Sequence, residues 1–169
     1  SQCLKCNPGL KIVRPPKMDE RGLFRFKPGY ATPALQTALD WSEWGGFGGA
    51  VEMCNNNGTC RKLADGAMCP SFRATHDEMH VTRGRANTLR LAISGQLGPD
   101  ALTSPETKAA LDLCVSCKAC KRECPTGVDM ARMKIEVLAQ RHATHGLPLR
   151  ERLIAYLPRY APYAARLAP

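Results

Sequence analysis

The sequence predicts a mainly α-helical domain that follows an extended N-terminal arm. Apolar residues recur every three or four positions in several stretches after residue 80, and no stretch alternates with a period of two. Proline and glycine interrupt the first fifty residues. With 169 residues, 44% hydrophobic and 23% charged, the chain can form one modest core, and it is neither a disordered chain nor an integral membrane protein.

The N-terminal arm is predicted over residues 1–48. The prolines that interrupt it are Pro15, Pro16, Pro28 and Pro33. A glycine cluster lies at its C-terminal boundary and consists of Gly45, Gly46, Gly48 and Gly49. Their spacing does not fit GxGxxG and no strand precedes them, so we expect a flexible linker and not a nucleotide-binding loop.

Apolar spacing predicts a helix that follows the arm, with one buried face and its arginines mostly on the other faces. The apolar residues on the expected buried face are Ala86, Leu89, Ile93 and Leu97. The arginines expected elsewhere are Arg83, Arg85 and Arg90.

Three further helical segments complete the predicted domain. Ser104 fits an N-cap and Pro105 a first helical position, so a short helix should run toward Cys114. A longer helix should begin near residue 128 and end near Gly146. Its expected apolar stripe is Val128, Ala131, Ile135 and Leu138. The tail, residues 147–169, reads as a further helical segment that Pro158 interrupts.

The cysteines carry the strongest functional signal. There are nine, and an odd number without a visible signal peptide indicates metal binding and not a disulfide framework. Cys114, Cys117, Cys120 and Cys124, followed by proline, form the pattern CxxCxxCxxxCP. In this pattern three thiolates bind one 4Fe-4S cluster and the fourth serves a second cluster. Cys69, which also precedes a proline, is therefore predicted as the fourth ligand of the first cluster.

A second cluster site is predicted at Cys124 with Cys54 and Cys60. Asn57 stands where a middle cysteine is expected, and eight residues separate Cys60 from Cys69 where the full pattern has three. Three thiolates could hold a 3Fe-4S cluster, a 4Fe-4S cluster with a ligand other than cysteine, or nothing. The alternative is that Cys54 and Cys60 are simply buried residues.

A net charge of +9 leaves a function of another class open. Four thiolates can also bind zinc, and a basic zinc-stabilised adaptor could bind nucleic acid without redox activity. We favour a basic shell that offsets the negative charge of thiolate-ligated clusters, without nucleic-acid binding. The cations considered for either role are Arg83, Arg85, Arg90, Lys121 and Arg122. Cys3 and Cys6 have no partner pair and are interpreted as incidental, with an accessory metal site as the alternative.

Several segments resemble a known family. Cys69-Pro70-Ser71-Phe72 followed by Thr82-Arg83-Gly84-Arg85 resembles the iron-sulfur subunit of glycolate oxidase. The likeness is closer to FAD-linked D-2-hydroxy-acid dehydrogenases of the D-lactate and D-2-hydroxyglutarate type. The segments that carry this closer likeness are AVEMCNNNG (50–58), TRGRAN (82–87) and CPTGVDM (124–130).

The resemblance implies an α-helical ferredoxin-like domain over residues 49–146. Residues 1–48 would then be the arm from a preceding flavin domain, and residues 147–169 would lead to a further domain. The domain would pass electrons from FAD to a quinone or protein acceptor, while a D-2-hydroxy acid is oxidised elsewhere in the enzyme. The implied location is the cytoplasm, with peripheral association at the inner face of the membrane as a possible addition. The succinate dehydrogenase iron-sulfur subunit, which is similar, holds a 3Fe-4S cluster where its middle cysteine is replaced.

Overall fold

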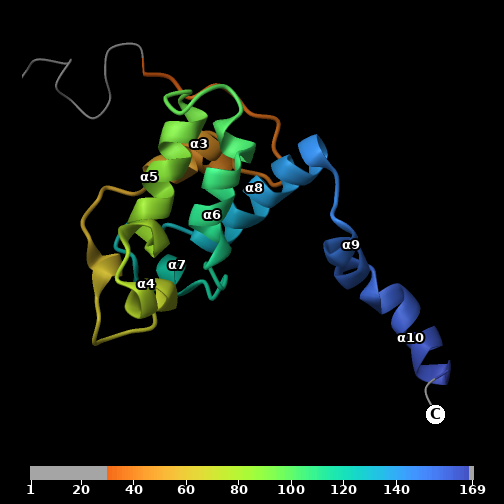
Figure 1. Ribbon diagram of the computed structural model, residues 1–169. Helices are drawn as coiled ribbons and strands as arrows, with labels where there is room; N and C mark the ends of the chain where they lie inside the picture. The colour runs from red at the N-terminus through yellow and green to blue at the C-terminus, as the bar shows by residue number, and fades with distance from the viewer. Residues whose placement is uncertain (1–29, 168–169) are drawn as a thin grey trace, which may run out of the picture. The chain divides into compact units, whose positions relative to one another are not determined.

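The computed structural model describes residues 30–167, and every regular element in that range is helical (Figure 1). The α-helices are α3 (Phe47–Glu52), α4 (Pro70–Thr75), α5 (Thr82–Ile93), α6 (Pro105–Asp112), α7 (Ala119–Glu123), α8 (Met130–His145), α9 (Leu149–Ala155) and α10 (Leu157–Leu167). The 3-10 turns are η2 (Ser42–Trp44), η3 (Thr59–Arg61), η4 (Glu78–His80) and η5 (Ala101–Thr103). The mainly α fold class is confirmed. Cys3, Cys6 and most of the predicted arm lie outside the described residues.

Helix α5 lies at the centre of the domain and packs against α3, α6 and α8. In Figure 1, α5, α6 and α8 run beside one another, and the short helices α4 and α7 lie near one end of this group. Ala86, Leu89 and Ile93 are buried as the apolar spacing predicts. Leu97 is 53% exposed, because α5 ends at Ile93 and Gly95 turns the chain with a φ of 74°.

The expectation for the arginines of α5 is wrong for two of the three. Arg85 and Arg90 are buried, while Arg83 keeps part of its side chain in solvent and pairs with Glu78. The periodicity of apolar residues could not show this, because α5 is enclosed by other helices on more than its apolar face. A guanidinium can be buried when its N–H groups find acceptors.

The helices predicted to begin at Pro105 and near residue 128 start close to the expected residues. Ser104 accepts a hydrogen bond from the Thr107 backbone N–H at 3.2 Å, with Pro105 in the first turn of α6. Asp129 caps α8, where its carboxylate accepts from the Arg132 backbone N–H at 3.0 Å. The apolar stripe predicted for α8 is wrong in part, because Ile135 is 50% exposed. The side chains that α8 buries are Met130, Ala131, Met133, Glu136 and Val137.

A buried carboxylate joins the segment before η2 to α8. Glu136 accepts hydrogen bonds from the backbone N–H groups of Ala38 and Leu39 and from the indole N–H of Trp41, each at 3.0 Å. Gln140 donates a fourth at 3.0 Å. Burial disfavours the charged form, yet these donors hold the pKa of Glu136 below its ordinary value. One side chain thus satisfies four donors at the start of the described fold.

Gly48 and Gly49 lie within α3 and pack closely, so the expected flexible linker is wrong at these two positions. Gly46 precedes α3, and a Cβ on Gly49 would lie only 1.9 Å from the carbonyl oxygen of Trp44. Phe47 is buried and packs edge-on against Trp41, with ring centroids 5.0 Å apart. Helix α3 spans the predicted boundary at residue 48, and the division into three domains stays a prediction.

The tail forms two short helices, α9 and α10, divided at Tyr156. Pro158 lies in the first turn of α10, where a missing N–H costs little. Many of the larger apolar side chains of α9 and α10 are exposed. Within residues 30–167, none of the helices has the length and apolar character needed to cross a bilayer.

We predict that Glu136→Ala lowers the free energy of unfolding by about 3 kcal/mol, because four N–H donors lose their acceptor. Urea unfolding at neutral pH measures this, with Glu43→Ala, which removes an exposed carboxylate, as the control. Since the folded-state pKa is lowered, the stabilisation is complete above the ordinary carboxylate pKa and is lost as pH falls through the lowered value. Equal free energies of unfolding for Glu136→Ala and Glu43→Ala would contradict the stabilising role of the Glu136 carboxylate.

Candidate functional site

The three cysteines of the CxxCxxC segment occupy the loop between α6 and α7 and the first turn of α7. Cys114 and Cys117 lie in the loop, and Cys120 lies within α7. Ser116 and Lys118 have positive φ angles of 54° and 59°. Such conformations cost a non-glycine residue on the order of 1 kcal/mol each. The loop is therefore held in a strained path around its cysteines.

Cys69 reaches this loop from a distant part of the chain. It is the residue before α4, with a positive φ of 52°. Its sulfur accepts a hydrogen bond from the Thr82 backbone N–H at 3.1 Å and lies 2.9 Å from the Thr82 hydroxyl. Thr82 is the first residue of α5, so the positive end of that helix faces the Cys69 sulfur.

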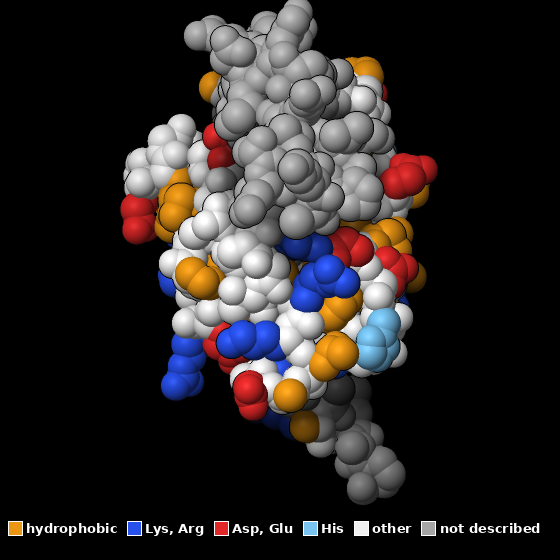
Figure 2. Space-filling view, turned by 90° about the vertical axis from the view of Figure 1, so that its left-hand side faces the viewer, with side chains coloured by type: hydrophobic (Ala, Val, Ile, Leu, Met, Phe, Trp, Pro, Cys, Tyr) orange, Lys and Arg blue, Asp and Glu red, His pale blue; other side chains and the backbone are white. Residues whose placement is uncertain are grey.

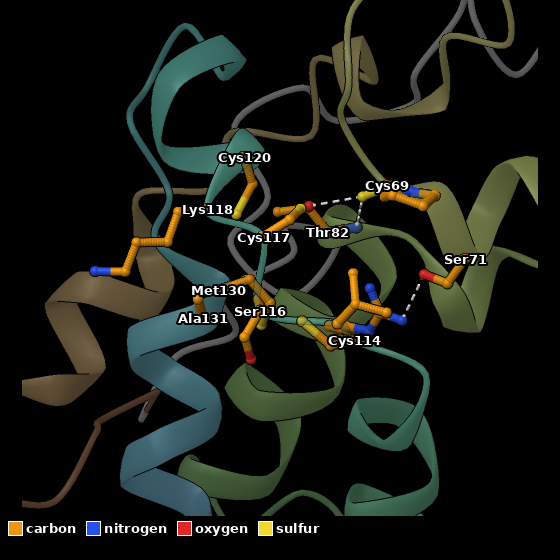
Figure 3. A pocket seen from close by; sticks show the side chains of 13 residues that line it. Cys69, Ser71, Thr82, Cys114, Ser116, Cys117, Lys118, Cys120, Met130 and Ala131 are labelled. Atoms are coloured by element: carbon orange, nitrogen blue, oxygen red, sulfur yellow. Dashed lines mark hydrogen bonds between the residues drawn. The ribbon is translucent and has the colours of Figure 1, made fainter.

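Cys69, Cys114, Cys117 and Cys120 line one partly open cavity (Figure 3). Cys69 and Cys120 are buried, Cys114 is half-buried and Cys117 is exposed. The structure thus brings together the four cysteines predicted for the first cluster. Their assignment as ligands stays a prediction.

Backbone N–H groups also point at the sulfur of Cys120. Burial raises the pKa of the Cys120 thiol, and hydrogen bonds from the backbone of Met130 and Ala131 act in the opposite direction by favouring the thiolate. Met130 and Ala131 form the first turn of α8 and line the same cavity. The first turns of both long helices, α5 and α8, therefore donate to cysteine sulfur.

Two side chains that the sequence did not single out hold the ligand segments together. The Glu123 carboxylate, on α7, accepts from the backbone N–H groups of Ala67 at 2.7 Å and Met68 at 3.1 Å, just before Cys69. Lys134 on α8 donates to the backbone carbonyl of Cys114 at 2.7 Å. No motif marks either residue, because each acts on the backbone of a distant segment.

The residues around the cavity fit an iron-sulfur cluster. The seven cysteines of the described range are all free thiols, four of them surround a space, and N–H donors face the sulfurs as they do around cluster thiolates. Among residues 30–167 no three His, Cys, Asp or Glu side chains converge closely enough to hold a single metal ion. A cluster occupies the space between its thiolates, so its cysteines need not converge on a single point.

The other three predicted ligands lie at the ends of short elements. Cys54 follows α3 by two residues, Cys60 lies within η3, and Cys124 directly follows α7 as its C-cap. Helix α7 packs on η3, and Cys60 is near enough to Cys54 and Cys69 to interact electrostatically. Burial raises the pKa of Cys60 to about 11.

Cys124 differs from Cys60. Its burial favours the neutral thiol, but hydrogen bonds from the Thr126 hydroxyl and from the backbone of residues 126–128 lower its pKa below the ordinary value. The Thr126 hydroxyl lies 3.2 Å from the sulfur. Asn57, at the position of the missing cysteine, is exposed, and its side chain accepts from the Thr59 backbone N–H at 2.8 Å.

The cations near the cysteines do not form one surface. Arg85 lines the cavity, Arg83 pairs with Glu78 at 2.6 Å, and Lys121 and Arg122 are exposed on α7. On the face shown in Figure 2, Lys and Arg side chains lie among Asp, Glu and hydrophobic side chains. The described residues on that face give no support to a basic nucleic-acid-binding stripe.

Residues 50–128 match the family model of the 4Fe-4S dicluster domain. The chain is 31% identical to D-2-hydroxyglutarate dehydrogenase of Escherichia coli K12, over 70% of this chain and 15% of that enzyme. It is 29% identical to the enzyme of the same name from Pseudomonas putida, over 78% of this chain and 16% of the relative. The glycolate oxidase iron-sulfur subunit of E. coli K12 is 30% identical over 59% of this chain and 24% of that subunit.

The chain therefore spans about 15% of the length of the dehydrogenases that it matches. No solved structure gives a significant match. The comparisons bear out the resemblance to these families and an electron-transfer role, and they give no support to a zinc-dependent nucleic-acid adaptor. Over residues 50–128 the chain is similar to the 4Fe-4S dicluster domain family, and over most of its length it is similar to D-2-hydroxyglutarate dehydrogenases.

Proposed function

We propose that this domain transfers electrons within a FAD-linked D-2-hydroxy-acid dehydrogenase, with D-2-hydroxyglutarate or D-lactate as the substrate. The observation that carries the proposal is the cavity at which Cys69 meets the three cysteines of the 114–120 segment. When bound there, a 4Fe-4S cluster accepts and releases single electrons, which amino acid side chains do not do on their own. The substrate would bind in another part of the enzyme.

In this proposal Cys69, Cys114, Cys117 and Cys120 hold the first cluster. Thr82 and the backbone of Met130 and Ala131 stabilise the thiolates by hydrogen bonding. Cys117 is the exposed member of the four, so electrons would cross the protein surface beside it. The sulfurs of Cys69 and Cys120 are buried, so water would be kept away from that side of the cluster.

We further propose that Cys54, Cys60 and Cys124 hold a second cluster, of the 3Fe-4S or 4Fe-4S type. Two findings support this: the matched family is a dicluster domain, and α7, which Cys124 directly follows, packs on the turn that contains Cys60. The donors around the Cys124 sulfur favour its thiolate form. The missing middle cysteine favours the three-iron type.

The partners proposed for the domain follow from its resemblance to FAD-linked dehydrogenases. A flavin domain or subunit would supply the electrons, and a quinone or a protein would accept them. We place the domain in the cytoplasm, where free thiols persist, with peripheral contact at the inner face of the membrane. The free cysteines and the exposed apolar side chains of α9 and α10 support this location.

The anaerobically purified protein should be brown, should lose its visible absorbance on reduction with dithionite, and should contain acid-labile sulfide. At least about four irons per chain are expected for the first cluster. Metal and sulfide analysis together with EPR before and after reduction checks this. Stoichiometric zinc without sulfide would contradict the electron-transfer function.

Cys69→Ala should remove the first cluster or leave it in a three-iron form, since one of the four thiolates is lost. The iron content and the EPR spectrum of the reduced protein measure this. Cys6→Ala is the matched control, because this cysteine is interpreted as incidental, and it should retain the wild-type iron content. An unchanged iron count in Cys69→Ala would remove Cys69 from the ligand set.

Asn57→Cys should convert a three-iron second site into a four-iron site by supplying the missing thiolate. The oxidised wild-type protein should then show a 3Fe-type EPR signal that the variant lacks, and the variant should gain about one iron. Asn55→Cys, which places a thiol two residues earlier in the same exposed loop, should leave the signal in place. Absence of the signal in the wild type, with equal iron in the variant, would refute a three-iron site.

A further inference from the structure

Arg85 is the most deeply buried of the arginines near the cysteines. Its side chain is 2% exposed and lines the cavity that Cys69 and the 114–120 segment share. It lies in the first turn of α5, the turn that also directs the Thr82 N–H at the Cys69 sulfur. One helical turn therefore brings a hydrogen-bond donor and a full positive charge to this cavity.

The hydrogen-bond partners of Arg85 are neutral. Its Nε donates to the backbone carbonyl of Ala110 at 2.8 Å, and one of its terminal nitrogens donates to the Ser71 hydroxyl at 2.9 Å. No ion pair joins Arg85 to an Asp or Glu within the described range. These two bonds use two of the five N–H donors of a guanidinium.

A buried guanidinium without an anion is costly, since removing the charge from water is not offset by neutral acceptors alone. Arg83, two residues earlier, avoids this cost with its bond of 2.6 Å to Glu78 and with partial exposure. Arg85 has neither a carboxylate partner among the described residues nor appreciable exposure to solvent. The anions that its cavity can provide are the thiolates of the four cysteines.

We propose that Arg85 is the internal counter-charge of the first cluster and raises its reduction potential. This inference rests on the proposed function. Four thiolates give the assembled site a net negative charge, and the added electron of the reduced form makes it more negative. A fixed cation at the cavity wall therefore stabilises the reduced form more than the oxidised form.

Arg85 also has a structural role that a test must separate from its charge. It bridges Ser71, which follows the Cys69 segment, and Ala110, which precedes the Cys114 loop. Arg85→Gln keeps a hydrogen-bond donor and removes the charge, whereas Arg85→Lys keeps the charge and loses the planar fork. Arg90→Gln is the matched control, because Arg90 is buried on the same helix but is not among the residues that line the cavity.

The experiment is a redox titration of the reconstituted full chain, followed by EPR of the first cluster and normalised to iron content. At the midpoint potential of the wild type, the ratio of reduced to oxidised cluster should fall about tenfold in Arg85→Gln. It should stay within about threefold of the wild type in Arg85→Lys and in Arg90→Gln. A glutamine variant that loads no iron, beside a lysine variant that loads fully, would also support the counter-charge.

Two results would overturn the proposal. The first concerns the redox balance: the ratio of reduced to oxidised cluster in a fully loaded Arg85→Gln protein equals that of the wild type, or this ratio falls equally in Arg85→Gln and Arg85→Lys. The second is loss of iron from both variants, which would give Arg85 a purely geometric role. Iron and sulfide in the wild type are measured first, so a failure of the proposed function itself would be seen there.

Discussion

The site depends on holding two distant segments of the chain around one cavity, and polar side chains supply most of the connections. Arg85 bridges Ser71 and Ala110, and Glu123 fixes the backbone just before Cys69. Thr82 donates to the Cys69 sulfur itself. Since the loop between Cys114 and Cys120 is strained at two positions, cluster binding and folding should be coupled, as is usual when ligands come from separate segments.

Two buried charged side chains, Glu136 and Arg85, are compensated in different ways. Glu136 is surrounded by four N–H donors, so its carboxylate is satisfied within the protein and ties the start of the described chain to α8. Arg85 has neutral oxygens and a cavity lined with cysteines. The first arrangement is complete without a cofactor. The second is electrostatically balanced once an anionic group occupies the cavity.

Local rules predicted the helices well. The cap at Ser104, the buried Ala86, Leu89 and Ile93, and the end of α8 at Gly146 follow from short-range chemistry. The failures concern burial and packing. Ile135 is exposed and two arginines of α5 are buried, because the faces that a helix covers depend on its neighbours. Gly49, inside α3, allows close packing against Trp44 and is not part of the expected flexible linker.

The sequence by itself determined the fold class and the chemistry of the site, since thiol spacing and apolar periodicity are properties of a continuous stretch of chain. Only the tertiary structure decided that Cys69 borders the 114–120 loop and that Arg85 faces the same cavity. It also decided that Cys117 alone of those four thiols is exposed. These features depend on contacts between residues far apart in the chain, and the burial and pairing of a charge are set by those contacts and not by its sequence neighbours.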